Sequence, residues 1–189
     1  TGTGGSARRS CTWTVGGRAN VAPGTYTIEF RVTDDDTLST VTTADIVVKP
    51  EDARVAYIGP VVASSTSNPT QVELRATVRD ISIVPGIVPP DLEPGDIRKA
   101  IVSFVDRTSG ATLCTAQVTQ MFAGDTTTGV AACMATMPAA ATAYQIGSVV
   151  GGWYTRNDAA DDTLVTIRPP NLDGLHGNRR QVVEALDAL

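Results

Sequence analysis

The clearest pattern in the chain is an alternation of apolar and polar side chains that begins at Gly24 and ends at Thr33. A period of two is typical of a β-strand with one buried face and one solvated face. Pro23 and Gly24 supply the turn before this strand, and an acidic run ends it because adjacent like charges pack poorly in a sheet. One face holds Tyr26, Ile28, Phe30 and Val32, and the other holds Thr25, Thr27, Glu29, Arg31 and Thr33.

Further apolar segments of strand length recur through the chain at a spacing of about ten residues, which is typical of a sandwich. The charged, proline-containing stretch 49–52 predicts a domain boundary. Residues 85–96 contain four prolines and two glycines, so they predict a long loop through which no strand can run. The predicted strands are 41–48, 55–57, 71–79, 99–106, 112–121, 130–137, 143–150 and 164–167.

The run from Pro23 through Tyr26, Ile28, Phe30 and Val32 to Asp36 resembles the late strands of a PKD or cadherin-like immunoglobulin-type module. Residues 41–48 resemble the last strand of such a module, so the resemblance covers residues 12–50. It implies a β-sandwich of the kind that repeats in secreted and cell-surface bacterial proteins, without catalysis of its own. A full module needs about seven strands in ~80 to 100 residues, so this one is incomplete.

Residues 53–169 resemble a second bacterial immunoglobulin-like module, with a less specific pattern. We therefore predict an all-β fold with two immunoglobulin-like β-sandwich modules, the first incomplete, over residues 1–50 and 51–169. A connector and a short C-terminal helix follow over residues 170–189. Asn178 can cap this helix, and its apolar positions recur at helical spacing, so it needs a surface on its own chain or on another. The predicted interface residues are these helical positions, Val182, Leu186 and Leu189, together with Cys11.

Charge and apolar content exclude two classes of partner. The net charge is −5 and the only lysines are Lys49 and Lys99, whereas phosphate binding needs clustered basic residues, so we expect no nucleic acid partner. The apolar runs are too short to cross a bilayer, so we expect no membrane insertion.

The three cysteines predict one bridge and one remaining thiol. Cys114 and Cys133 flank the turn at residues 124–129, so they can face each other across a hairpin in the oxidising compartment that the composition suggests. The alternative is two buried free thiols, which behave as small apolar side chains. Cys11 is left either free or paired with another chain.

Two acidic turns are the best candidates for a metal site. Asp34, Asp35 and Asp36 form one, and Asp158, Asp161 and Asp162 form the other. Calcium favours clustered carboxylates, and the resemblance to cadherin-like modules supports such sites. The alternative is a pair of solvated turns, because Asp is a good turn former.

No set of residues points to catalysis, since the only histidine, His176, lies in a glycine-rich connector. We therefore expect a protein that is not an enzyme. Trp153 and Tyr154 follow two glycines and fit either an exposed aromatic platform for a sugar or a buried core position.

Two functions remain open. The first is a secreted, cell-surface structural protein, whose incomplete module pairs with strands or edges of neighbouring chains and forms a filament if the contacts do not close. The alternative is a non-catalytic accessory module of a secreted enzyme or adhesin that binds glycan or protein. The first predicts self-association, and the second predicts saturable ligand binding.

Overall fold

The computed structural model describes residues 21–33, 37–65, 68–81, 94–139 and 143–168. The chain divides into two compact units, Thr1–Val48 and Lys49–Leu189. Most of the described residues are in strands, and their two helices are short 3-10 turns, η1 (Ile97–Lys99) and η2 (Ala159–Asp161). The all-β prediction is therefore confirmed, whereas the predicted C-terminal helix lies outside the described residues.

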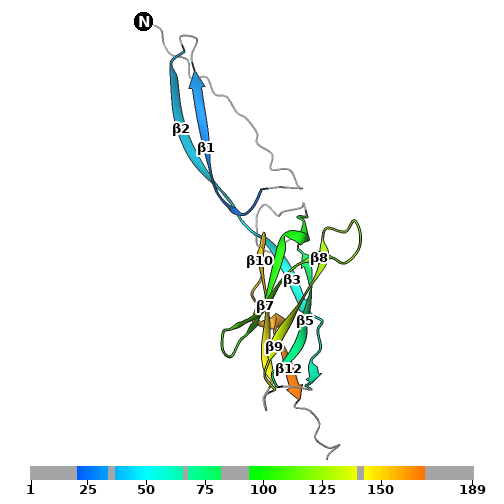
Figure 1. The fold of residues 1–189 in the computed structure, drawn as a ribbon. Coiled ribbons are helices and arrows are strands. Elements are labelled where there is room, and N and C mark those ends of the chain that lie inside the picture. Colours follow the sequence, from blue (N-terminus) through cyan, green and yellow to red (C-terminus); the bar gives the residue numbers. More distant parts are fainter. Residues whose placement is uncertain (1–20, 34–36, 66–67, 82–93, 140–142, 169–189) are drawn as a thin grey trace, which may run out of the picture. The chain divides into compact units, whose positions relative to one another are not determined.

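The described part of the first unit is a single antiparallel hairpin of β1 (Gly24–Thr33) and β2 (Ser39–Val48). Its register runs from Gly24 opposite Val48 to Thr33 opposite Ser39, and Figure 1 shows the two strands side by side. Directly opposed residues share a face of a sheet, so the apolar residues of β1 lie beside those of β2. This hairpin face comprises Tyr26, Ile28, Phe30, Val32, Ala44, Ile46 and Val48.

The hairpin face is less buried than its alternation predicts. Tyr26 and Ile28 are half-buried, but Phe30 is 44% exposed and Val32 is 71% exposed. The reason is that the described residues of this unit form one sheet, with no second sheet stacked on it to make a sandwich.

The second unit is a sandwich of two five-stranded sheets (Figure 1). The first sheet has the order β4 (Val62–Ser64), β12 (Thr163–Arg168), β10 (Tyr144–Gly152), β6 (Ala100–Asp106) and β7 (Thr112–Gln117). The second sheet has the order β11 (Tyr154–Thr155), β3 (Glu51–Tyr57), β5 (Thr70–Asp80), β9 (Thr128–Met137) and β8 (Thr119–Gln120).

This strand order is that of an immunoglobulin-type sandwich. In order across the sheet, β3, β5, β9 and β8 take the positions of strands A, B, E and D, which form one sheet of that fold. β6, β10 and β12 take the positions of C, F and G in the other sheet, and β7 adds a neighbour to C. Long central strands with strict alternation therefore supply the core from both sheets.

The core of the second unit lies between the two sheets. The ring of Tyr57 meets that of Phe104 edge-on, with 6.3 Å between centroids. Alternation in β5 places every second residue inward, as predicted. The largest fully buried side chains from both sheets and η1 are Phe104, Leu74, Ile97, Met137, Ile146 and Ile167.

The segment predicted as one strand over 112–121 is instead two strands in different sheets. β7 pairs with β6, whereas β8 pairs with β9, so the chain crosses between sheets at Val118. Val118 is 1% exposed, and its amide donates to the carbonyl of Ala100. Gly129 faces the crossing, where a Cβ atom would collide with the Val118 side chain. Alternation could not reveal the crossing, because a buried residue fits either sheet.

The predicted bridge between Cys114 and Cys133 is present, with 6.1 Å between the Cα atoms. It does not cross a hairpin, as the sequence suggested. Cys114 lies opposite Phe104 in one sheet, and Cys133 lies opposite Leu74 in the other. The disulfide therefore ties the edge strand of one sheet to the opposing sheet, on the same side of the sandwich as the crossing at Val118.

The boundary between the units is shorter than predicted. β3 begins at Glu51, and the Glu51 amide donates to the Trp153 carbonyl at 2.8 Å. β11 pairs in parallel with Glu51 and Asp52. These two residues, which the sequence placed in the linker, therefore belong to a sheet.

Candidate functional site

Several predicted site residues lie outside the described part of the chain. These are the thiol of Cys11, the acidic run Asp34, Asp35 and Asp36, and the helical positions Val182, Leu186 and Leu189. The strands on either side of the acidic run are described, however. Because Thr33 pairs with Ser39, the run belongs to the connection that closes the β1–β2 hairpin.

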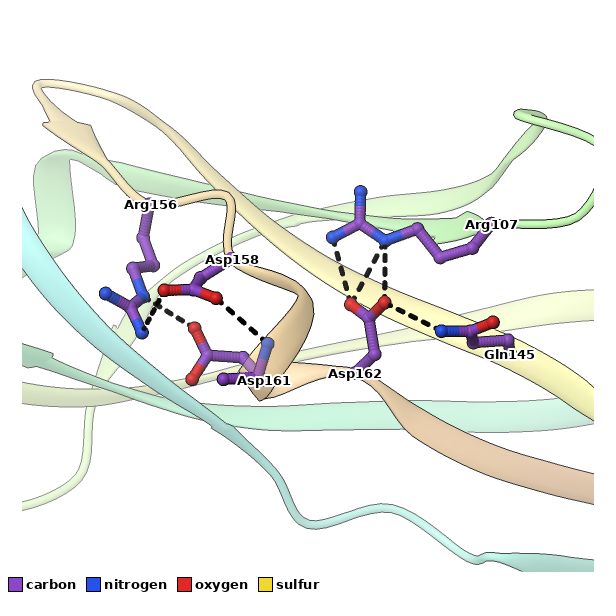
Figure 2. Close-up of polar contacts among 7 residues, drawn as sticks. Arg107, Gln145, Arg156, Asp158, Asp161 and Asp162 are labelled. Carbon is purple, nitrogen blue, oxygen red and sulfur yellow. Dashed lines mark hydrogen bonds and ion pairs between the residues drawn. The ribbon is translucent and has the colours of Figure 1, made fainter.

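The second acidic turn is built around η2. Asp158 caps this short helix, because its side chain accepts a hydrogen bond from the amide of Ala160 at 2.9 Å. Figure 2 shows that the turn presents its carboxylates to two different arginines. Asp161 and Asp162 follow directly and lead into β12.

Arg107 holds Asp162 with its planar guanidinium (Figure 2). Its Nε and Nη2 atoms each donate to Asp162 Oδ1 at 3.0 Å, and the Asp162 side chain is only 5% exposed. Gln145 donates to the other carboxylate oxygen at 3.2 Å. Arg107 crosses the backbone of β10 at Gly147, where a Cβ atom would collide with the guanidinium. The glycine therefore makes room for this ion pair.

Arg156 holds the other two carboxylates of the turn. Its Nε donates to Asp161 Oδ2 at 2.5 Å, and its Nη2 lies 3.2 Å from Asp158 Oδ2. The hydrogen bond to Asp161 raises the pKa of Arg156 above its usual range. Arg156 itself bridges back to β10 through its backbone pairing with Val150.

These contacts give the three carboxylates of the turn a structural role. Each is bonded to an arginine or an amide, so these contacts join the turn to β10 and to the chain after β6. Among the residues that the structure describes, no three His, Cys, Asp or Glu side chains gather in a way that could hold a metal ion. The three residues predicted to bind calcium in this turn instead form ion pairs with two arginines. Asp162 pairs with Arg107, and Asp158 and Asp161 pair with Arg156.

Tyr154 is a core residue, 2% exposed. Its hydroxyl donates to Asp80 Oδ2 at 2.9 Å, and the amide of Gly95 donates to the same oxygen at 2.8 Å. Burial, followed by the bond to Asp80, raises the pKa of Tyr154 strongly. The sequence analysis did not single out Asp80, although extending the alternation of β5 by one step places it inward.

Trp153 is half-buried against the core, and the ammonium of Lys99 lies 5.2 Å from its ring centroid. Because Tyr154 is buried and Trp153 is partly covered, no pair of exposed rings exists here to stack on a sugar. The glycan-binding alternative therefore gains no specific support from this region.

The surface that remains is the hairpin itself. Within the described residues, β1 and β2 pair only with each other, so each strand has an outer edge without a partner. Exposed apolar side chains occur along both strands, with Phe30, Val32 and Ile46 on the hairpin face and Val41 and Val47 on the other face. This hairpin is the candidate interaction site of the chain.

In the described part of the chain, no helix has the length and apolarity needed to cross a lipid bilayer. Comparison with protein-family models and with curated proteins gave no match to this chain.

Proposed function

We propose that this chain is an extracellular structural protein whose β1–β2 hairpin associates with neighbouring chains by strand or edge pairing. A contact between different surfaces of identical chains extends into a filament when it does not close. The proposal assigns no catalysis to the chain.

The observation that carries the proposal is the open hairpin. A strand edge exposes a row of unpaired amides and carbonyls that can template pairing with another chain. A two-stranded hairpin is also marginally stable alone, and it gains stability when further strands cover its apolar face. The exposure of Phe30 and Val32 shows that such cover is missing toward the turn within the described structure.

The disulfide supports an extracellular setting. Structural disulfides persist in oxidising compartments and are rare in reducing ones. The bond between Cys114 and Cys133 joins two sheets of a well-packed sandwich, so it belongs to the folded architecture of the second unit.

The test is the molar mass of the protein by light scattering over a range of concentrations. The proposal predicts that mass rises with concentration, and that Phe30→Ser combined with Val32→Ser weakens this rise. Leu164→Ser is the matched control, because Leu164 is equally apolar and 63% exposed but lies on β12 of the second unit. A wild-type protein that stays monomeric at every concentration contradicts the proposal.

A further inference from the structure

The outer face of the sheet formed by β3, β5 and β9 carries three exposed arginines. Arg54 lies on β3, and Arg75 and Arg79 lie on β5, at positions that alternate with buried core residues. We call this surface, with the small residues between the arginines, the arginine face. It is an unusual feature in a chain whose net charge is −5.

Two of these arginines are placed directly against each other. The antiparallel register pairs Arg54 with Arg79, so both side chains leave the sheet on the same face. Directly opposed side chains have Cβ atoms about 5 Å apart, and like charges at such positions are destabilising. The fold therefore contains a local repulsion that a bound anion would relieve.

Within the described residues, no carboxylate is paired with these arginines. The side chains of Arg54, Arg75 and Arg79 form no hydrogen bond or ion pair in the structure described. Apart from Arg168, every other described arginine is paired with a carboxylate: Arg31, Arg98, Arg107 and Arg156. The unpaired arginines are thus concentrated on one face.

Within β3 and β5, the acidic residues on the side of the arginine face lie at its two ends. Glu73 precedes Arg75 by two positions on β5, and Asp52 precedes Arg54 by two positions on β3, where its charge acts on Arg156. Between the arginines the surface is built from small side chains. Ala56 lies opposite Thr77, and Ala132 lies opposite Arg75. These small side chains leave space for a loop to contact the guanidinium groups.

The same chain contains an acidic segment whose charge is complementary to that of the arginine face. Asp34, Asp35 and Asp36 lie in the short connection between Thr33 and Ser39, at the end of the hairpin opposite to Val48. These three adjacent carboxylates are opposite in charge to the three arginines of the arginine face. Arginine is also the side chain best matched to carboxylates, because its planar fork can bind both oxygens.

We propose that the arginine face binds the acidic hairpin turn of a second copy of this chain. The proposal rests on the assembly function above and specifies one contact within it. The turn of one copy supplies Asp34 to Asp36, and the sheet of the next copy supplies Arg54, Arg79 and Arg75. Because the two surfaces differ, the contact is head-to-tail and can repeat.

The test is sedimentation velocity of purified protein at low and high salt. We expect the double variant Arg54→Glu/Arg79→Glu to weaken self-association by about tenfold or more, and high salt to weaken that of the wild type. Arg168→Glu is the matched control, because Arg168 is exposed and unpaired but lies on β12. Adding Asp34→Lys, Asp35→Lys and Asp36→Lys to the double variant should restore association.

Two measurements keep the test independent of misfolding. The melting temperature of Arg54→Glu alone should not fall below that of the wild type, since the change replaces a like-charge pair with an opposite-charge pair. The neutral double variant Arg54→Gln/Arg79→Gln should also associate less than the wild type.

The outcomes separate this inference from the assembly function. Association of Arg54→Glu/Arg79→Glu at wild-type strength overturns the inference and leaves assembly by strand pairing intact. A wild type that remains monomeric contradicts both. If that double variant assembles normally but loses retention on a sulfated polysaccharide column, the arginine face is a glycan site and the inference is wrong.

Discussion

At the scale of single residues, the second unit is held in part by polar side chains that join positions far apart in the sequence. Asp80 ends β5 inside the core, where it is 7% exposed, and one of its oxygens receives both the Tyr154 hydroxyl and the Gly95 amide. Its other oxygen is buried with no hydrogen-bond partner. A buried carboxylate that loses a donor is left short of a hydrogen bond, so this small network is sensitive to substitution.

Tyr154→Phe should therefore destabilise the protein by about 1–3 kcal/mol, the usual cost of leaving a buried acceptor short of a partner. Chemical denaturation followed by tryptophan fluorescence measures the change. Tyr144→Phe is the control, because the Tyr144 hydroxyl donates to the Pro138 carbonyl at an exposed position. We expect that control to change stability by less than about 0.5 kcal/mol. Equal effects of the two substitutions would contradict the role given to Asp80.

The ion pairs of the acidic turn show why site chemistry was hard to predict from sequence. The sequence shows Asp158, Asp161 and Asp162 as a cluster, which is the pattern that calcium favours. It does not show that Arg107, more than fifty positions earlier, returns to hold Asp162. Carboxylates that are close in sequence therefore bind different arginines, and only the tertiary fold brings those arginines near.

At the scale of elements, local alternation was a good guide to strands and a poor guide to sheets. The strand predicted over 71–79 appears as Thr70–Asp80, and that over 143–150 as Tyr144–Gly152. Strand formation depends on the near-neighbour pattern, which the sequence shows directly. Sheet membership depends on long-range pairing, so the crossing at Val118 and the inter-sheet position of the disulfide were missed.

The disulfide between β7 and β9 should contribute substantially to stability. Replacing Cys114 and Cys133 together with alanine should cost about 3 kcal/mol on the chain-entropy account, since the bridge closes a loop with a sequence separation of 19. Thermal unfolding of oxidised protein measures the loss. Cys11→Ala is the control and should leave the melting temperature unchanged. If both variants melt with the wild type, the bridge has no stabilising role.

At the scale of the whole molecule, the described parts of the two units differ in how much of their apolar surface is buried. The second unit closes its core between two sheets, with side chains from both that are fully buried. The described part of the first unit is a hairpin with open edges and an exposed apolar end. The alternation of β1 predicted a buried face, and under the proposed assembly another chain would cover the part of that face that is exposed here.

In the proposed assembly, the arginine face would fix the orientation of one copy relative to the next. Strand edges alone pair with many partners, whereas opposite charges on two different surfaces select a particular one and favour a particular orientation. The acidic turn and the arginine face are both on the same chain, so a head-to-tail series of identical copies satisfies each of them. In such a series, the carboxylates of one copy would offset the repulsion between Arg54 and Arg79 of the next copy.

The most direct test of assembly through the hairpin is amide hydrogen exchange of β1 and β2 as a function of protein concentration. In an antiparallel hairpin, alternate amides point away from the partner strand and exchange with solvent. Our account predicts that these outward amides become protected at concentrations where the molar mass rises, while those of β5 and β9 are unchanged. Outward amides that exchange equally fast in monomer and assembly would contradict strand pairing by the hairpin.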